Sequence, residues 1–210
     1  MRLDRLVQTL RRLRHVVLVH GAGSGPWIWD GWRGELADFD VEAVDLQRGL
    51  AVDRASMADY AAQIPAADAV VGWSLGGLAA MIAAQERPPR RLALLEPSAP
   101  AEVQGRDDAV TPRAGTFDPQ EVYGPFPPGV AARPESLLAR DERKRGISVP
   151  SLPCPALVVY GDEFAEERGR VLARYYGADE LHFPGLDHWG LVFDGGVAAA
   201  VADYLSRSAA

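Results

Sequence analysis

The stretch Val70-Val-Gly72-Trp-Ser74-Leu-Gly76-Gly77 decides the fold expected for this chain. It places Ser74 between glycines, after β-branched residues and before the apolar run from Leu78 to Ala84. This order predicts a strand, a sharp turn and a helix. A serine in such a turn presents its hydroxyl clear of the sheet, and glycines are needed where a Cβ would collide with a neighbouring element. The following helix would direct its first N–H groups and its positive dipole end to the same point.

A histidine has to accept the proton of a nucleophilic serine, and an acid has to orient that histidine. His188 is the candidate among the four histidines, because it lies in the Pro/Gly-rich loop 183–190 after a predicted strand. Catalytic groups gather in such loops of parallel sheets. His15 opens an apolar run and His182 lies inside a predicted strand, so both are expected to be structural.

Three carboxylates compete for the role of the acid. Asp162 is preferred, because it follows the strand-like run 155–160 and precedes His188 in the chain. Glu96, at the end of the strand-like run 91–96, is the second candidate, and Glu163 is the third. Each of them could instead be a helix cap or a solvated loop charge.

The segment Val16–Trp27 is a buried-type strand that runs into the glycine-rich loop His20-Gly21-Ala22-Gly23. Such a loop can turn a backbone N–H inward, toward a developing oxyanion. The rival interpretation is a dinucleotide-binding loop, since Asp45 ends the next strand-like run. That fingerprint requires a third glycine where this chain has Pro26, so nucleotide binding is disfavoured.

These pieces together resemble the α/β-hydrolase family. The matching motifs come in the order nucleophile, acid, histidine and span nearly the whole chain: His20-Gly21-Ala22-Gly23, Gly72-Trp-Ser74-Leu-Gly-Gly77, Tyr160-Gly161-Asp162 and Gly185-Leu-Asp-His188. The elbow is similar to that of carboxylesterases, and the His-Gly-Ala-Gly segment is similar to that of plant-type methylesterases and hydroxynitrile lyases.

The resemblance implies an α/β fold with a mostly parallel sheet of about six strands, flanked by helices. It implies a serine esterase in which His188 activates Ser74, with Asp162 as the preferred acid, and in which the N–H groups of Ala22 and Leu75 bind the oxyanion. No metal or organic cofactor is implied. The alternatives are a hydroxynitrile lyase-like enzyme on the same scaffold and a non-catalytic binding protein that retains the fold.

Two features depart from the family pattern. The family places its acid three residues after the glycine that ends the strand, where this chain has Phe164, whereas some members carry the acid after the preceding strand, where Glu96 stands. The family also begins with a β-hairpin. Here the segment 2–13 carries apolar residues at helical spacing, which favours a basic amphipathic helix.

We expect a single domain over residues 1–210, with a short insert at about 97–155 that contains 11 of the 16 prolines. In the family this is the place of the lid, and long irregular inserts in compact domains are often functional. The insert, together with the five tryptophans, predicts an apolar pocket that favours small apolar or aromatic esters over charged substrates.

The composition of the chain limits the kinds of binding partner that we expect. The net charge of −7 argues against nucleic acid, and there is no apolar run of membrane-spanning length. The N-terminus lacks the apolar core of a secretory signal, and Cys154 is the only cysteine. We therefore expect a cytoplasmic enzyme that acts on a small-molecule ester.

Overall fold

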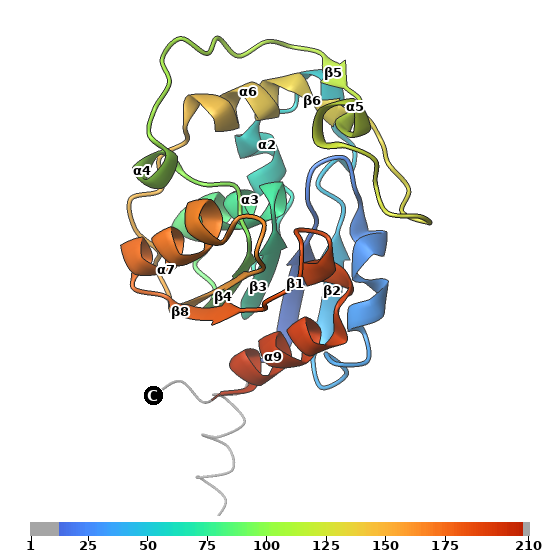
Figure 1. Cartoon of the computed structure of the whole chain (residues 1–210), viewed down its shortest axis with the longest axis vertical. Helices are drawn as coiled ribbons and strands as arrows, with labels where there is room; N and C mark the ends of the chain where they lie inside the picture. The colour runs from blue at the N-terminus through green and yellow to red at the C-terminus, as the bar shows by residue number, and fades with distance from the viewer. Residues whose placement is uncertain (1–12, 208–210) are drawn as a thin grey trace, which may run out of the picture.

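The structure, a computed structural model, describes residues 13–207, and its centre is a six-stranded sheet. All five strand pairs in this sheet are parallel, in the order β2-β1-β3-β4-β7-β8. The strands are β1 (His15–Val19), β2 (Asp40–Val44), β3 (Ala69–Trp73), β4 (Arg91–Leu95), β7 (Ala156–Tyr160) and β8 (Asp179–His182). The predicted α/β fold with a parallel sheet of about six strands is confirmed (Figure 1).

The central strands β3, β4 and β7 are buried along their whole length. Eleven of their 15 residues are Ala, Val or Leu, as expected for parallel strands that are covered on both faces. Because successive side chains of a strand alternate between faces, Val17 and Val19 join one core while Val16 and Leu18 join the other.

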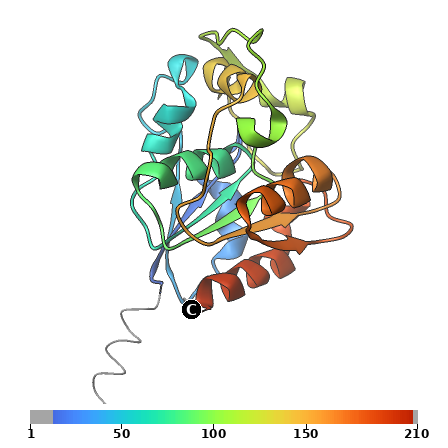
Figure 2. The same ribbon diagram turned by 90° about the vertical axis from the view of Figure 1, so that its left-hand side faces the viewer.

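Helices cover both faces of the sheet (Figures 1 and 2). One core lies under α2 (Met57–Ala62), α3 (Leu75–Glu86) and α7 (Val171–Tyr176). The other lies under η1 (Pro26–Trp32), α8 (Gly190–Phe193) and α9 (Gly195–Ser206). Figure 2 shows α3 and α9 on opposite sides of the sheet.

Three of the predicted helices take a different local form. From the sequence we expect a helix over 27–38 and another over 54–63. In the structure the first is a short 3₁₀ segment, η1, and the second is divided into η2 (Val52–Arg54) and α2. The sequence also predicts a helix over 164–176. In the structure this segment begins as a π-helix, η3 (Ala165–Arg170), and continues as α7. The sequence therefore predicted where these helical segments lie, but it did not predict that parts of them are 3₁₀ or π-helical.

The insert between β4 and β7 contains α4 (Ala101–Gln104), α5 (Pro119–Tyr123) and α6 (Leu137–Arg145). It also contains a small antiparallel pair, β5 (Thr116–Phe117) and β6 (Glu135–Ser136). Figure 1 shows the insert at the end of the molecule that lies away from α9. From the sequence we expect one or two helices in the insert, near 118–123 and 134–145, and these correspond to α5 and α6. The sequence did not predict α4 or the strand pair.

Two further expectations concern the N-terminal segment and membrane-spanning helices. The amphipathic helix expected over 2–13 lies outside the described residues, apart from Leu13, which is buried. Within residues 13–207, none of the helices has the length and apolar character that crossing a membrane requires.

Candidate active site

Ser74 lies between the end of β3 and the start of α3, with φ of 56°. A positive φ is rare for a residue with a side chain and marks a strained turn. The turn has no room for side chains at its glycines: a Cβ on Gly72 would lie 2.7 Å from the Gly76 carbonyl oxygen, and one on Gly76 would lie 2.5 Å from the Val19 carbonyl oxygen. The spacing of glycines around Ser74 is therefore a steric requirement of the strand–helix packing.

The carboxylate of Glu96 contacts His188. Its Oε2 lies 2.6 Å from Nδ1 of His188, and its Oε1 accepts a hydrogen bond of 2.8 Å from the Gly161 N–H. Glu96 is fully buried and follows β4, next to the strand that carries Ser74. Within residues 13–207, Ser74 and Glu96 are the only residues other than glycine with a positive φ. Strained backbone of this kind clusters at functional sites.

The expected contact between Asp162 and His188 does not occur in the structure. Asp162 accepts hydrogen bonds of 2.8 Å from the Gly185 N–H and pairs at 2.8 Å with Nε2 of His182. The Gly185 N–H and His182 hold the pKa of Asp162 below its ordinary value. Asp162 thus stabilises the loop that carries His188, but it does not touch the imidazole.

The reason is the register of the chain after β7. A Cβ on Gly161 would collide with the Leu186 backbone, and the Asp162 N–H donates to the Leu186 carbonyl at 2.8 Å. The His188 loop therefore lies directly against residues 161–162, and the Asp162 side chain meets the start of that loop. Glu163, the third candidate, accepts a hydrogen bond of 3.0 Å from the backbone N–H of His188.

Ser74 and His188 line one cavity of about 260 Å³. Among the described residues no hydrogen bond joins the Ser74 hydroxyl to the imidazole. Hydrogen bonds between a nucleophile and its base often tighten only when a substrate is bound. Two aromatic residues hold His188 in place. The Trp73 indole N–H donates to the backbone carbonyl of His188 at 3.1 Å, and the ring centroids of Trp73 and Phe164 lie 4.8 and 5.3 Å from that of the imidazole.

Ala22 lines the same cavity, and Leu75 begins α3 directly after Ser74. The N–H of a first helical residue has no partner within its own helix, so the Leu75 N–H is available to a ligand oxygen. Ala22 and Ser74 thus line one cavity, and Leu75 directly follows Ser74. The role of their N–H groups as oxyanion donors stays a prediction.

Two residues of the insert hold the loop that carries Ala22, and sequence analysis missed both. The Gly23 N–H donates to Oε2 of the buried Glu135 at 2.8 Å, and the Gly23 carbonyl accepts from the Arg133 N–H at 2.9 Å. The Arg133 side chain also donates to the Ser24 carbonyl and pairs with Asp45. Only folding of the insert over the sheet brings these residues to the loop, so no local pattern could have shown them.

Aromatic side chains form much of the cavity wall: Trp73, Tyr123, Phe126, Phe164 and Trp189. Trp27, Trp29 and Trp32 do not line this cavity. Trp29 and Trp32 are buried in the core under η1, while Trp27 is partly exposed. Two of the five tryptophans therefore shape the cavity. Over residues 13–207, no group of three or more His, Cys, Asp or Glu side chains is arranged to hold a metal ion.

Three features define the class of α/β proteins with a serine elbow: a parallel sheet, a strained serine after a central strand, and a histidine held by a buried carboxylate. The sequence profile of the alpha/beta hydrolase family matches residues 16–203. The chain therefore belongs to the alpha/beta hydrolase family. No curated protein sequence matches the chain significantly.

Solved structures share this fold at low sequence identity. Polyneuridine aldehyde esterase superposes with a TM-score of 0.62 at 18% identity, covering 93% of this chain and 100% of that one. Tomato methylketone synthase I in complex with 2-tridecanone gives 0.64 at 18% identity, covering 94% and 99%. The thioesterase RedJ of the prodiginine pathway of Streptomyces coelicolor gives 0.61 at 21% identity, covering 95% and 92%.

Proposed function

We propose that the chain is a serine hydrolase that cleaves a carboxylic ester or thioester through Ser74, His188 and Glu96. The observation that carries this proposal is the 2.6 Å contact between Glu96 and Nδ1 of His188, a histidine that lines the same cavity as Ser74. An acid in this position fixes the tautomer in which Nε2 can accept a proton.

The proposed reaction begins when Nε2 of His188 accepts the Ser74 proton and the Ser74 oxygen attacks the substrate carbonyl. The N–H groups of Leu75 and Ala22 stabilise the oxyanion that forms. The imidazolium then donates its proton to the departing alcohol or thiol, which leaves an acyl ester on Ser74. A water molecule, deprotonated by His188, hydrolyses this ester and restores the serine.

An ester or thioester is the substrate class we infer, because one of the similar structures is named as an esterase and another as a thioesterase. The aromatic wall made by Trp73, Phe126 and Trp189 suits an apolar acyl group. We further propose that the insert 97–155 serves as a lid of a single domain, since Tyr123, Phe126 and Arg143 close one side of the cavity.

The test is hydrolysis of 4-nitrophenyl butyrate by the purified protein and by Ser74→Ala. The proposal predicts turnover that Ser74→Ala reduces by several orders of magnitude, because the members of a triad act as a unit. Ser151→Ala is the matched control, since this serine is exposed and lies outside the cavity. Turnover by Ser74→Ala equal to that of the wild type would contradict the proposal. A reaction that never forms an acyl ester on Ser74, as expected of a lyase, would contradict it as well.

A further inference from the structure

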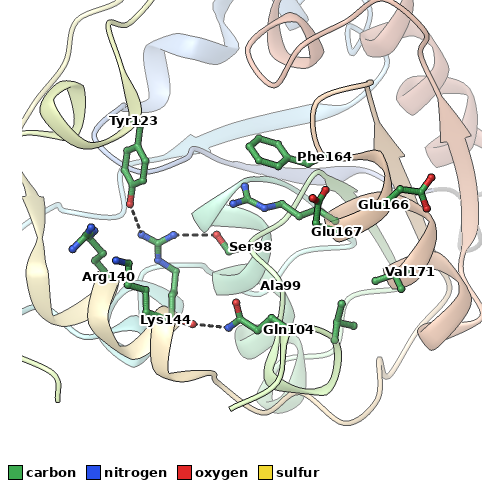
Figure 3. A pocket seen from close by; sticks show the side chains of 13 residues that line it. Ser98, Ala99, Gln104, Tyr123, Arg140, Lys144, Phe164, Glu166, Glu167 and Val171 are labelled. Carbon is green, nitrogen blue, oxygen red and sulfur yellow. Dashed lines mark hydrogen bonds between the residues drawn. The ribbon is translucent and has the colours of Figure 1, made fainter. Parts of the chain in front are cut away.

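A second and larger cavity, of about 650 Å³, adjoins the Ser74 cavity. The two cavities share four lining residues: Tyr123, Arg143, Phe164 and Arg168. Figure 3 shows the larger cavity between α6 and Tyr123 of the insert on one side and the segment from Phe164 to Val171 on the other. A substrate whose carbonyl lies at Ser74 can therefore extend into this second space.

Positive charge dominates the second cavity. Arg140, Arg143 and Lys144 line it from α6, and Arg168 lines it from η3. The carboxylates in its lining are Glu166 and Glu167, and Glu166 pairs with Arg170. A chain with a net charge of −7 thus gathers four cationic side chains around one cavity.

Two of these cations have no carboxylate partner and are partly removed from water. Arg143 donates to two neutral hydroxyls, Ser98 at 3.1 Å and Tyr123 at 3.3 Å, and its buried Nε has no partner among the described residues (Figure 3). Arg168 lies over the Phe164 ring, 4.1 Å from its centroid. Within residues 13–207, no ion pair joins a carboxylate to Arg143, Lys144 or Arg168.

Such an arrangement favours the binding of an anion. Burial and the nearby Arg143 lower the pKa of Arg168 below its ordinary value, and the more distant charges of Glu96 and Glu163 offset this only in part. The guanidinium nevertheless remains charged at neutral pH. Like charges in a half-buried cavity repel each other more strongly than in water. Planar guanidinium groups bind carboxylates and phosphates with strong, charge-assisted hydrogen bonds.

We propose that the second cavity binds an anionic group of the substrate, a carboxylate or a phosphate, while the scissile carbonyl lies at Ser74. The proposal rests on the proposed hydrolase function and adds the substrate class. It departs from the sequence-based expectation that uncharged esters are preferred. That expectation followed from the tryptophans and prolines, whereas the charged stretch of α6 and Arg168 come together only in the folded chain.

The test compares matched substrate pairs in which one member carries an anionic group and the other is its neutral counterpart. One pair places a carboxylate in the acyl group: mono-4-nitrophenyl glutarate against its neutral methyl ester. The other places a phosphate in the leaving group: butyryl phosphopantetheine against butyryl pantetheine. We expect the charged member of one pair to have the higher kcat/KM, by about tenfold or more, as expected for hydrogen bonds to charged groups. The preferred pair identifies the anion.

Variants tie this preference to the cavity. Arg168→Gln and Arg143→Gln should reduce the ratio of charged to neutral kcat/KM toward one, and Lys144→Gln, farther from Ser74, should reduce it in part. Arg174→Gln on α7 is the matched control, because this arginine is exposed and outside both cavities. Circular dichroism and Tm establish that each variant is folded. A charged-to-neutral ratio near one in both pairs of the wild-type protein would overturn the proposal.

Failure of the anion site and failure of the hydrolase proposal give different results. If the neutral esters are cleaved in a Ser74-dependent manner without any charge preference, the hydrolase proposal stands and the anion site is wrong. If no ester is cleaved, calorimetric titration of Ser74→Ala with glutarate and with inorganic phosphate decides the matter. Binding that Arg143→Gln and Arg168→Gln weaken and Arg174→Gln does not would support the site, and no binding of either anion would overturn it.

Discussion

Oε2 of Glu96 lies 2.6 Å from Nδ1 of His188, while Oε1 of the same carboxylate accepts the Gly161 N–H at 2.8 Å. Both oxygens of this fully buried side chain are thus engaged, one by the imidazole and one by the segment that follows β7. Glu96 therefore fixes the ring of His188 and the neighbouring strand end at the same time. A carboxylate bound in this way has one orientation, and so has the histidine.

The first prediction separates Glu96 from Asp162. Glu96→Gln should lower kcat/KM on the order of 10³- to 10⁴-fold at neutral pH, because the charge that orients the imidazole is lost. Asp162→Asn should leave kcat/KM within about tenfold, since Asp162 contacts His182 and Gly185 and does not contact His188. Steady-state kinetics of the two variants provides the comparison. If Asp162→Asn loses most of its kcat/KM while Glu96→Gln keeps a near-normal value, Asp162 and not Glu96 is the acid of the triad.

The second prediction concerns the steric basis of the elbow. Gly76→Ala should destabilise the protein by about 1–3 kcal/mol or more, because the new Cβ would meet the backbone of Val19 and His20. Gly34→Ala is the matched control, since its Cβ would have no heavy atom within 4 Å. Urea unfolding at equilibrium measures both free energies. Equal stability of the two variants would show that the elbow can relax without cost.

The third prediction concerns the contact between the insert and the loop that carries Ala22. Glu135→Ala removes the acceptor of the Gly23 N–H and should lower kcat on the order of tenfold to a hundredfold, the effect expected of a misplaced oxyanion donor. Glu135→Gln keeps one acceptor oxygen and should recover part of the loss. Kinetics of the two variants at saturating ester gives the comparison.

Tyr60→Phe is the control for Glu135. The Tyr60 hydroxyl bonds to the same carboxylate, but Tyr60 does not touch Gly23. Its loss should therefore cost stability, about 1 kcal/mol for a buried hydrogen bond, and leave kcat near that of the wild type. If Tyr60→Phe lowers kcat as much as Glu135→Ala does, the effect is a general loosening of the insert and Glu135 has no positioning role.

The sequence predicted the sheet, the serine elbow and the place of His188, because local patterns determine them. Buried strands are continuous apolar runs, and the elbow needs its glycines at fixed spacing. The contacts of His188 were harder to predict. The ranking of Asp162 over Glu96 assumed that the last strand supplies the acid, although Phe164 at the usual position and Glu96 at the end of β4 already pointed to the alternative.

The remaining features of the site depend on the folded insert. Arg133, Glu135 and Arg143 come from a segment with two short strands and short helices, where neither apolar periodicity nor a motif fixes the path of the chain. Their contacts span long separations in sequence, such as the 112 residues between Gly23 and Glu135. Local propensity carries no information about pairs of this kind.

The fourth prediction is a pH dependence of stability at Asp45. The His20 imidazole, 3.7 Å away, contributes most to holding the pKa of Asp45 well below its ordinary value, and the paired Arg133 guanidinium and the Gln47 N–H act in the same direction. A carboxyl whose pKa is lower in the folded than in the unfolded state contributes stability above the unfolded pKa, about 3.9, and loses this contribution as the pH falls toward the folded pKa.

Asp45→Asn should accordingly lower the free energy of unfolding on the order of 1 kcal/mol at pH 7, a value that allows for the partial exposure of the pair. The difference from the wild type should shrink below about pH 4. Urea unfolding at several pH values checks this, with the exposed Asp40→Asn as the control. A difference that stays constant from pH 7 to pH 3 would contradict the role of the Asp45 charge.

The most direct test of the proposed triad is labelling with a fluorophosphonate, followed by intact-mass and peptide-mass measurement. We expect one adduct per chain, on Ser74, that is absent in Ser74→Ala. Labelling should be slowed on the order of 10³-fold or more in His188→Ala and in Glu96→Gln, because serine attack needs an oriented base. Labelling of Ser74→Ala at the wild-type rate, or an adduct on another serine, would contradict the proposed triad.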